Sequence, residues 1–267
     1  MMLPGALQAQ PEGGFNASPG TADSGTKLRK PAVLKPPAVH SVLGHELAQN
    51  GSNGTLTFRS GPGDGPEIVK LTLAGESMFH PGEVCQIDAA AAEPLMARFD
   101  GWPNGLLRYA VEFRACPFSF EVLDGAVLVS RGPSPCEFQE ALCRADPAGL
   151  WGPQGNAIGP EEGKQFERER GRAESDVRVN FRALLSTVAK DQETAKKIVA
   201  EQAGFSSARE MTCRTYLKED VHGFCALRLT QARALALQAA YKEQIRTKVP
   251  TKPARESEKE TFGNPRR

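Results

Sequence analysis

The chain contains 267 residues, which is enough for one or two domains with cores of ordinary size. Its formal net charge is +1, so electrostatics give no reason to expect a nucleic acid or an anionic membrane surface as partner. Apolar runs fall well short of the roughly 18 consecutive residues that a membrane-spanning helix needs, and we expect no integral membrane segment.

An even number of cysteines is spread widely along the chain: Cys85, Cys116, Cys136, Cys143, Cys213 and Cys225. Such a set favours three disulfides in an oxidising compartment, and hence a periplasmic or secreted protein. The alternative is six unrelated buried thiols in a cytosolic protein. The cysteines form no CxxC pair, and the histidines lie at no metal-ligand spacing from them. We therefore expect neither a metal site nor a cofactor.

Both ends of the chain differ in composition from the middle. Residues 1–50 are rich in Pro, Gly, Ala and Ser without a regular period, which predicts a disordered lead, and the charged stretch 246–267 predicts a disordered tail. Residues 1–9 lack the basic segment and the long apolar stretch of a signal peptide. We interpret them as the end of a signal peptide that starts upstream, because the cysteines independently indicate export. An ordinary flexible terminus is the alternative.

Residues 51–153 show the alternation of apolar and polar residues that is typical of half-buried strands. The alternating apolar positions are Leu56, Phe58, Val69, Leu71, Leu73, Leu107, Tyr109, Val111, Phe113, Phe118, Phe120 and Val122. Asn104-Gly105 and Asp124-Gly125 fall between such runs, where a two-residue hairpin turn needs positive φ. This region is predicted to be an antiparallel β meander of about six or seven strands, forming a sandwich or a small barrel.

A short helix is predicted from Ser134 to Cys143, because a Ser N-cap is followed by Pro at the first helical position. On such a helix Cys136 and Cys143 lie about 10 Å apart along the axis, which is too far for a mutual disulfide. We then expect them to pair separately with Cys85 and Cys116, and either combination remains open.

Helical periodicity dominates residues 160–245. Val177, Phe181, Leu184, Leu185 and Val188 lie on one face, Ala195, Ile198, Val199, Gln202 and Phe205 continue it after a cap at Asp191, and a third helix covers about 224–242. Two or three antiparallel helices can bury these faces against each other. The predicted fold class is thus α+β: a β domain at 51–153 followed by a disulfide-stapled antiparallel helical module at 160–245.

Two motifs in the helical region combine. Gln202, Phe205, Arg209 and Cys213 are spaced by 3, 4 and 4 residues, and Cys225, Thr230 and Arg233 follow with spacings of 5 and 3. Each set lies on one helical face, and the two cysteines flank a polar turn. A disulfide between Cys213 and Cys225 joins the end of one helix to the start of the next, and it is worth about 3 kcal/mol in the chain-entropy model.

These motifs resemble the LprI-type lysozyme-inhibitor family, in which Gln, an aromatic residue, Arg and Cys precede a second Cys, Thr and Arg. The resemblance covers about 80 residues, the helical part only. It implies an exported protein, and one subset of the family is linked to inhibition of c-type lysozyme. The chain departs from the pattern at Phe205, where the family usually has Trp, and at the N-terminus, which has no Cys that could be lipidated.

Each motif residue also has a structural interpretation. Phe205 is expected in the core, and Arg209 and Arg233 are expected to pair with carboxylates or helix-end carbonyls. Thr230 is expected to hydrogen-bond within its own helix pair. Gly204, beside Phe205, weakens the helix by up to about 1 kcal/mol relative to Ala.

The sequence favours a binding or inhibitory module of the cell envelope, with a cell-wall hydrolase such as lysozyme as the protein partner. The turn between the two helical cysteines is then the inserting element. The alternative is a scaffolding periplasmic protein whose β domain binds a partner protein or a glycan through its edge strands and Trp102 or Trp151. We expect no enzyme, because no nucleophile elbow, phosphate loop or metal spacing occurs.

Overall fold

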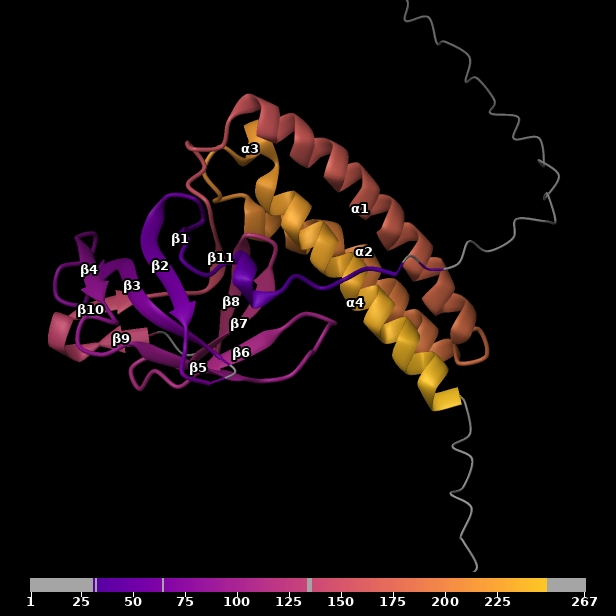
Figure 1. Cartoon of the computed structure of the whole chain (residues 1–267), viewed down its shortest axis with the longest axis horizontal. Coiled ribbons are helices and arrows are strands. Elements are labelled where there is room, and N and C mark those ends of the chain that lie inside the picture. Colours follow the sequence, from indigo (N-terminus) through magenta and orange to yellow (C-terminus); the bar gives the residue numbers. More distant parts are fainter. Residues whose placement is uncertain (1–30, 32, 64, 134–135, 249–267) are drawn as a thin grey trace, which may run out of the picture.

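The structure is a computed structural model, and it describes residues 31, 33–63, 65–133 and 136–248. A β-barrel is followed by helices that lie along one side of it, and this confirms the predicted α+β class (Figure 1). Within the described ranges, no helix is both long and apolar enough to cross a membrane. The predicted signal-peptide remnant at 1–9 and the tail residues 249–267 lie outside the described part of the chain.

Eight antiparallel strands close into a barrel in the order β2-β1-β11-β8-β7-β6-β5-β3, with β3 pairing back to β2. The strands are β1 (Glu46–Gln49), β2 (Asn53–Ser60), β3 (Pro66–Ser77), β5 (Leu95–Phe99), β6 (Arg108–Val111), β7 (Phe118–Leu123), β8 (Ala126–Arg131) and β11 (Gly149–Gly152). Because β11 enters between β8 and β1, the strand order departs from a simple meander. The alternating aromatic residues fill the interior, where the rings of Phe58 and Tyr109 both pack on Phe120.

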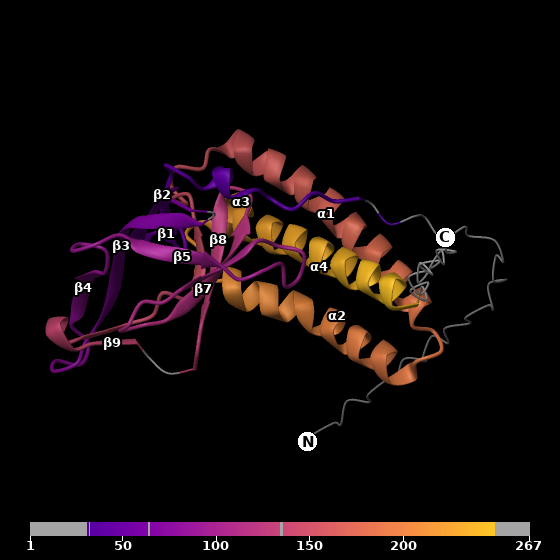
Figure 2. The same cartoon turned by 60° about the horizontal axis from the view of Figure 1, so that its bottom comes forward.

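Three further strands extend the second half of β3 at the end of the barrel away from the helices (Figures 1 and 2). They are β4 (Val84–Asp88), β9 (Cys136–Phe138) and β10 (Cys143–Ala145), and the 3₁₀ turn η2 (Gln139–Ala141) joins the last two. The predicted helix from Ser134 to Cys143 is therefore wrong, although Ser134 and Pro135 themselves lie outside the described residues. Burial alternates along β9, and pairing with β10 overrides the local capping pattern.

The predicted disordered lead, residues 1–50, includes residues that form regular structure. The 3₁₀ turn η1 (Val39–Ser41) is followed by β1, whose last three residues are buried. This strand pairs with β2 on one side and β11 on the other. Its four residues are too few to show alternation, so its place in the barrel depends on distant partners.

The helices are α1 (Pro160–Thr187), α2 (Gln192–Cys213), the short α3 (Glu219–His222) and α4 (Phe224–Lys248). Helix α2 runs antiparallel to α4, as expected, and returns toward the barrel beside it (Figure 2). Helices α1 and α4 instead run parallel, since Phe166 packs on Phe224 near one end and Asn180 donates to the Ala234 carbonyl further along. Asp191 caps α2 by accepting a hydrogen bond from Thr194 N, as its position indicated.

The barrel and the helices share one buried apolar cluster. The barrel contributes Leu106, Leu123, Ala126 and Leu150, and the helical part contributes Cys213, Tyr216, Phe224, Cys225, Leu229 and Leu235. Burial of such side chains contributes about 1.5–3 kcal/mol each for the larger ones. The helices are therefore held against the barrel by a common core, which fixes the position of the segment between α2 and α4.

Candidate functional site

The structure brings all five motif residues into one cluster between α2 and α4. Arg209 Nη1 donates a 2.8 Å hydrogen bond to Thr230 Oγ1, and Arg233 Nε donates a 3.0 Å hydrogen bond to Gln202 Oε1. The guanidinium carbons of Arg209 and Arg233 lie 5.5 and 5.9 Å from the centroid of the Phe205 ring. Phe205 itself is only half-buried, so its predicted place in the core is wrong: its ring packs against the two cations instead.

The cluster positions α2 rather than opening a binding surface. Arg209 also approaches Glu174 of α1 at 3.7 Å, and Thr230 Oγ1 donates to the Ala226 carbonyl within its own helix. Arg233 bonds an amide instead of a carboxylate, and its burial lowers the pKa of the guanidinium. Since Cys213 is the single fully buried residue of α2, these polar contacts and the adjacent disulfide hold that helix in place.

The six cysteines form three disulfides in the structure. Cys213 pairs with Cys225 at the junction of α2 and α4. Cys85 pairs with Cys143, and Cys116 pairs with Cys136, at the end of the barrel that carries the extra strands. The last two pairs join the expected partners, but Cys136 and Cys143 lie on the paired strands β9 and β10 rather than on one helix. Three disulfides favour an oxidising compartment.

The turn between the helical cysteines, residues 214–223, is anchored to the barrel. Leu217 N donates to the Asn50 carbonyl at 2.8 Å, and the Tyr216 hydroxyl donates to the Pro153 carbonyl at 2.6 Å. Gly155 approaches so closely that an added Cβ would lie 1.9 Å from the Leu217 carbonyl oxygen. These contacts cross more than 60 residues of sequence, so no local pattern could have predicted them.

Two titratable side chains fix the turn from inside. The Glu219 carboxylate accepts hydrogen bonds from the backbone N–H groups of Cys225 and Ala226 in the first turn of α4, while burial raises the pKa of this carboxyl. The buried His222 ring accepts from Phe224 N through Nδ1, so the hydrogen-bond network assigns Nε2 as the donor to the Leu217 carbonyl. Sequence reasoning missed both roles.

Despite these anchors, the turn presents apolar side chains to solvent. Val221 is 68% exposed and Leu217 is 36% exposed, and Met211 on the last turns of α2 is 69% exposed. Isolated exposed apolar residues are ordinary on protein surfaces. Three of them lie within or next to one disulfide-closed turn, and we name Met211, Leu217 and Val221 the apolar tip.

A groove of about 970 Å³ lies beside this tip, between α1, α2 and α3. Its walls carry Lys164, Glu167 and Arg170 from α1, Arg209 and Glu210 from α2, and Asp220 from α3. Cations and carboxylates are equal in number in this set, so the groove has no dominant charge. Electrostatic steering of a charged partner toward this groove would therefore be weak.

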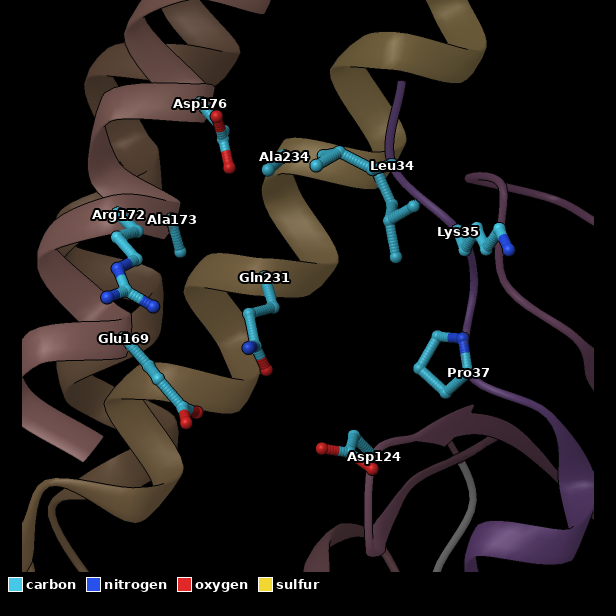
Figure 3. Close-up of a pocket in the computed structure, with 11 residues that line it drawn as sticks. Leu34, Lys35, Pro37, Asp124, Glu169, Arg172, Ala173, Asp176, Gln231 and Ala234 are labelled. Atoms are coloured by element: carbon cyan, nitrogen blue, oxygen red, sulfur yellow. The ribbon is translucent and has the colours of Figure 1, made fainter. Parts of the chain in front are cut away.

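A second cavity, of about 430 Å³, lies on another side of the helices (Figure 3). Glu169, Arg172 and Asp176 of α1 face it from one side, and the N-terminal residues Leu34 and Pro37 close the other. No sequence motif pointed to this cavity.

The two tryptophans differ in environment. Trp151 is fully buried, and its Nε1 donates to the Pro147 carbonyl, so its expected use as a binding residue is wrong. Its position on the short strand β11 turns the side chain into the barrel core. Trp102 is 51% exposed and makes an edge contact with the ring of Phe99 at 6.3 Å between centroids.

Among the described residues, no group of three or more His, Cys, Asp or Glu side chains is placed to hold a metal ion. Comparisons with family models, with curated proteins and with solved structures find no match to this chain. The resemblance of the helical part to the LprI-type family therefore stays a prediction, carried by the motif residues alone.

Proposed function

We propose that this protein is an exported binding module that contacts a partner protein through the turn at residues 214–223. The proposal is supported by one observation above all: the turn is closed by a disulfide and tied to the barrel, yet its Leu217 and Val221 side chains face solvent. A periplasmic or secreted location fits the three disulfides.

A rigid turn of this kind favours binding for a physical reason. Ordering a flexible loop at an interface costs about 0.5–1.5 kcal/mol for each immobilised side chain, and a loop that is already ordered avoids most of that cost. Leu217 and Val221 can then contribute their apolar burial directly to affinity. The turn contains two cations, Arg214 and Lys218, and two carboxylates, Glu219 and Asp220, so apolar contact rather than charge would dominate.

The specific form that we propose is inhibition of a cell-wall hydrolase, with c-type lysozyme as the first target to test. The motif resemblance supports this choice, and the exposed apolar side chains of the anchored turn suit contact with a substrate cleft. The test measures turnover of a peptidoglycan suspension by lysozyme with oxidised full-length protein in excess. We expect inhibition by the wild-type chain.

Val221→Asp places a charge on the tip without touching the buried anchors. We expect it to raise the half-inhibitory concentration at least about tenfold, which corresponds to about 1.4 kcal/mol of binding free energy. Val199→Asp is the matched control, because Val199 is also an exposed helical valine, at 46%, but lies on α2, outside the turn at 214–223. Unchanged turnover with wild-type protein would reject lysozyme as the target, and equal inhibition by the two variants would reject the turn as the contact.

Trp102 supports a second candidate, glycan binding by the barrel. An exposed indole held edge-on by Phe99 is a suitable surface for a sugar ring, and the Asn104 amide, two residues further along the chain, donates to the Glu121 carboxylate. Titration with soluble peptidoglycan fragments should change tryptophan fluorescence in wild-type protein but not in Trp102→Phe, since the remaining Trp151 is buried. An equal change in both proteins would reject this site.

A further inference from the structure

An extended N-terminal segment, residues 33–38, crosses the helices, and we name it the strap (Figure 1). It forms no helix or strand, and it passes over the groove between α1 and α4 before the chain enters the barrel. The strap is separate from the turn at 214–223, so a role for the strap does not depend on the proposed function.

Gln238 of α4 holds the strap by its backbone. Leu34 N donates to Gln238 Oε1 at 2.7 Å, and Gln238 Nε2 donates to the Leu34 carbonyl at 3.3 Å. The Gln238 side chain is 4% exposed, so its amide is aimed at the strap from inside the protein. Paired donation and acceptance of this kind is how an extended peptide backbone is recognised irrespective of its side chains.

Side-chain anchoring of the strap is slight by comparison. Leu34 packs against the cluster shared by the barrel and the helices, and against a second apolar cluster between α1 and α4. Val33 is 86% exposed, and Lys35 is also exposed. Figure 3 shows the Lys35 side chain directed away from α1. The strap is therefore attached to α4 chiefly by one apolar side chain and one amide pair.

The strap leaves much of the groove empty. The remaining cavity of about 430 Å³ is lined by the apolar side chains of Ala173, Ala234 and Leu235 and by charged side chains of both signs, namely Asp124, Glu169, Asp176, Lys35 and Arg172. Asp176 and Glu169 face it from α1 (Figure 3). Burial raises the pKa of Asp176, and no hydrogen bond or ion pair to another side chain within the described part of the chain offsets this burial.

Such a groove matches a longer anchor than Leu34. The aliphatic stem of an arginine or lysine can lie along the apolar wall while its cation reaches the carboxylates beyond. Asp124 already pairs with Arg228 at 3.1 Å, and Glu169 already accepts a 2.8 Å hydrogen bond from Gln165. Asp176 is therefore the acceptor for an incoming cation, with Arg172 as the wall cation on α1. An arginine additionally offers a planar set of donors that matches a carboxylate.

We propose that the groove between α1 and α4 is a binding site for an extended basic peptide segment of a partner protein, and that the strap occupies this site in cis. Gln238 holds the backbone of the incoming segment as it holds Leu34. An arginine or lysine at the position of Leu34 enters the cavity and pairs with Asp176. The strap therefore competes with the partner for the groove, and the partner segment must bind the groove more favourably than the strap does.

The test uses full-length protein with Leu34→Ser, which removes the cis anchor. Fluorescence anisotropy measures binding of labelled decapeptides with the sequence of residues 31–40, carrying Arg, Leu or Glu at the anchor position. We expect the Arg peptide to bind the variant at least about tenfold more tightly than it binds wild-type protein, and the Glu peptide not to bind. Adding Gln238→Ala should weaken both the Arg and the Leu peptide.

Asp176→Asn in the same background separates charge recognition from shape. It should weaken the Arg peptide several-fold and leave the Leu peptide unchanged, because only the first carries a cation to the carboxylate. Equal affinities of the three peptides, or no binding of the Arg peptide, would overturn the proposal. Dimerisation of the Leu34→Ser variant through exchanged straps would also overturn it, since the occupant would then be a second copy.

A second measurement uses wild-type protein, so its result does not depend on whether the variant folds. Hydrogen exchange of the Leu34 amide is followed in wild-type protein with and without excess Arg peptide. Displacement of the strap should accelerate this exchange while the amides of β7 and β8 remain unchanged. An unaltered Leu34 exchange rate at saturating peptide would count against competition for the groove.

Discussion

Arg209 of α2 and Thr230 of α4 are joined by a 2.8 Å hydrogen bond from Nη1 to Oγ1, across two helices that share few buried contacts. Thr230 also donates to Ala226, so its hydroxyl is oriented to accept from Arg209. The bond lies one helical turn from the buried Cys213. Together with the disulfide it sets the register of α2 on α4.

A double-mutant cycle of Arg209→Met and Thr230→Val measures this relationship. We expect a coupling energy of about 1.5 kcal/mol in the free energy of unfolding, which is the lower end of the range for hydrogen bonds with one charged partner. Urea denaturation of the four proteins gives the value. Arg214→Met, an exposed neighbour at the end of the same helix, is the control and should change stability by less than about 0.5 kcal/mol. Additive single effects would show that the hydrogen bond sets no register.

The Cys213–Cys225 disulfide should be worth about 3 kcal/mol, because it closes a loop of 12 residues in sequence separation. The measurement compares the free energy of unfolding of Cys213→Ser/Cys225→Ser with that of wild-type protein in non-reducing urea. The loss should exceed that of any exposed serine substitution on α2. If the double variant were as stable as wild type, the anchors of the turn alone would suffice to hold it.

Gly155→Ala should destabilise the protein by several kcal/mol, since the added Cβ would meet the Leu217 carbonyl oxygen at 1.9 Å and push the turn from the barrel. Gly204→Ala is the matched control on α2, where nothing lies within 4 Å of the new methyl group. It should stabilise the protein by up to about 1 kcal/mol through helix propensity. Thermal unfolding distinguishes the two substitutions, and a neutral Gly155→Ala would contradict the described contact.

Stability should depend on pH through Asp146. Arg131 donates two 2.6 Å hydrogen bonds to its carboxylate and holds the pKa of Asp146 below the ordinary value of 3.8. Because the folded-state pKa is the lower one, the pair stabilises the protein above pH 3.8, and this contribution is lost as the pH falls through the folded-state pKa. The stability difference between wild type and Asp146→Asn should therefore be constant near neutral pH and shrink in acid. A difference that does not vary with pH would contradict this.

Local sequence determined the strands that alternate, such as that of Phe118 and Phe120, and the tight turn at Asp124-Gly125 between β7 and β8. It also determined the cap at Asp191 and the shared faces of the motif residues. These features follow from φ/ψ preference and from periods of 2 and 3.6, which lie within a few neighbouring residues.

Only the tertiary structure decided what each apolar face meets. Pairing with β10 made Cys136–Phe138 a strand, closure of β3 onto β2 made a barrel, and packing made α1 parallel to α4. The contacts of Asn50 with Leu217 and of Leu34 with Gln238 span about 170 and 204 residues. A period shows which residues of an element are buried together, but the partner that covers them is chosen by complementarity across the whole chain.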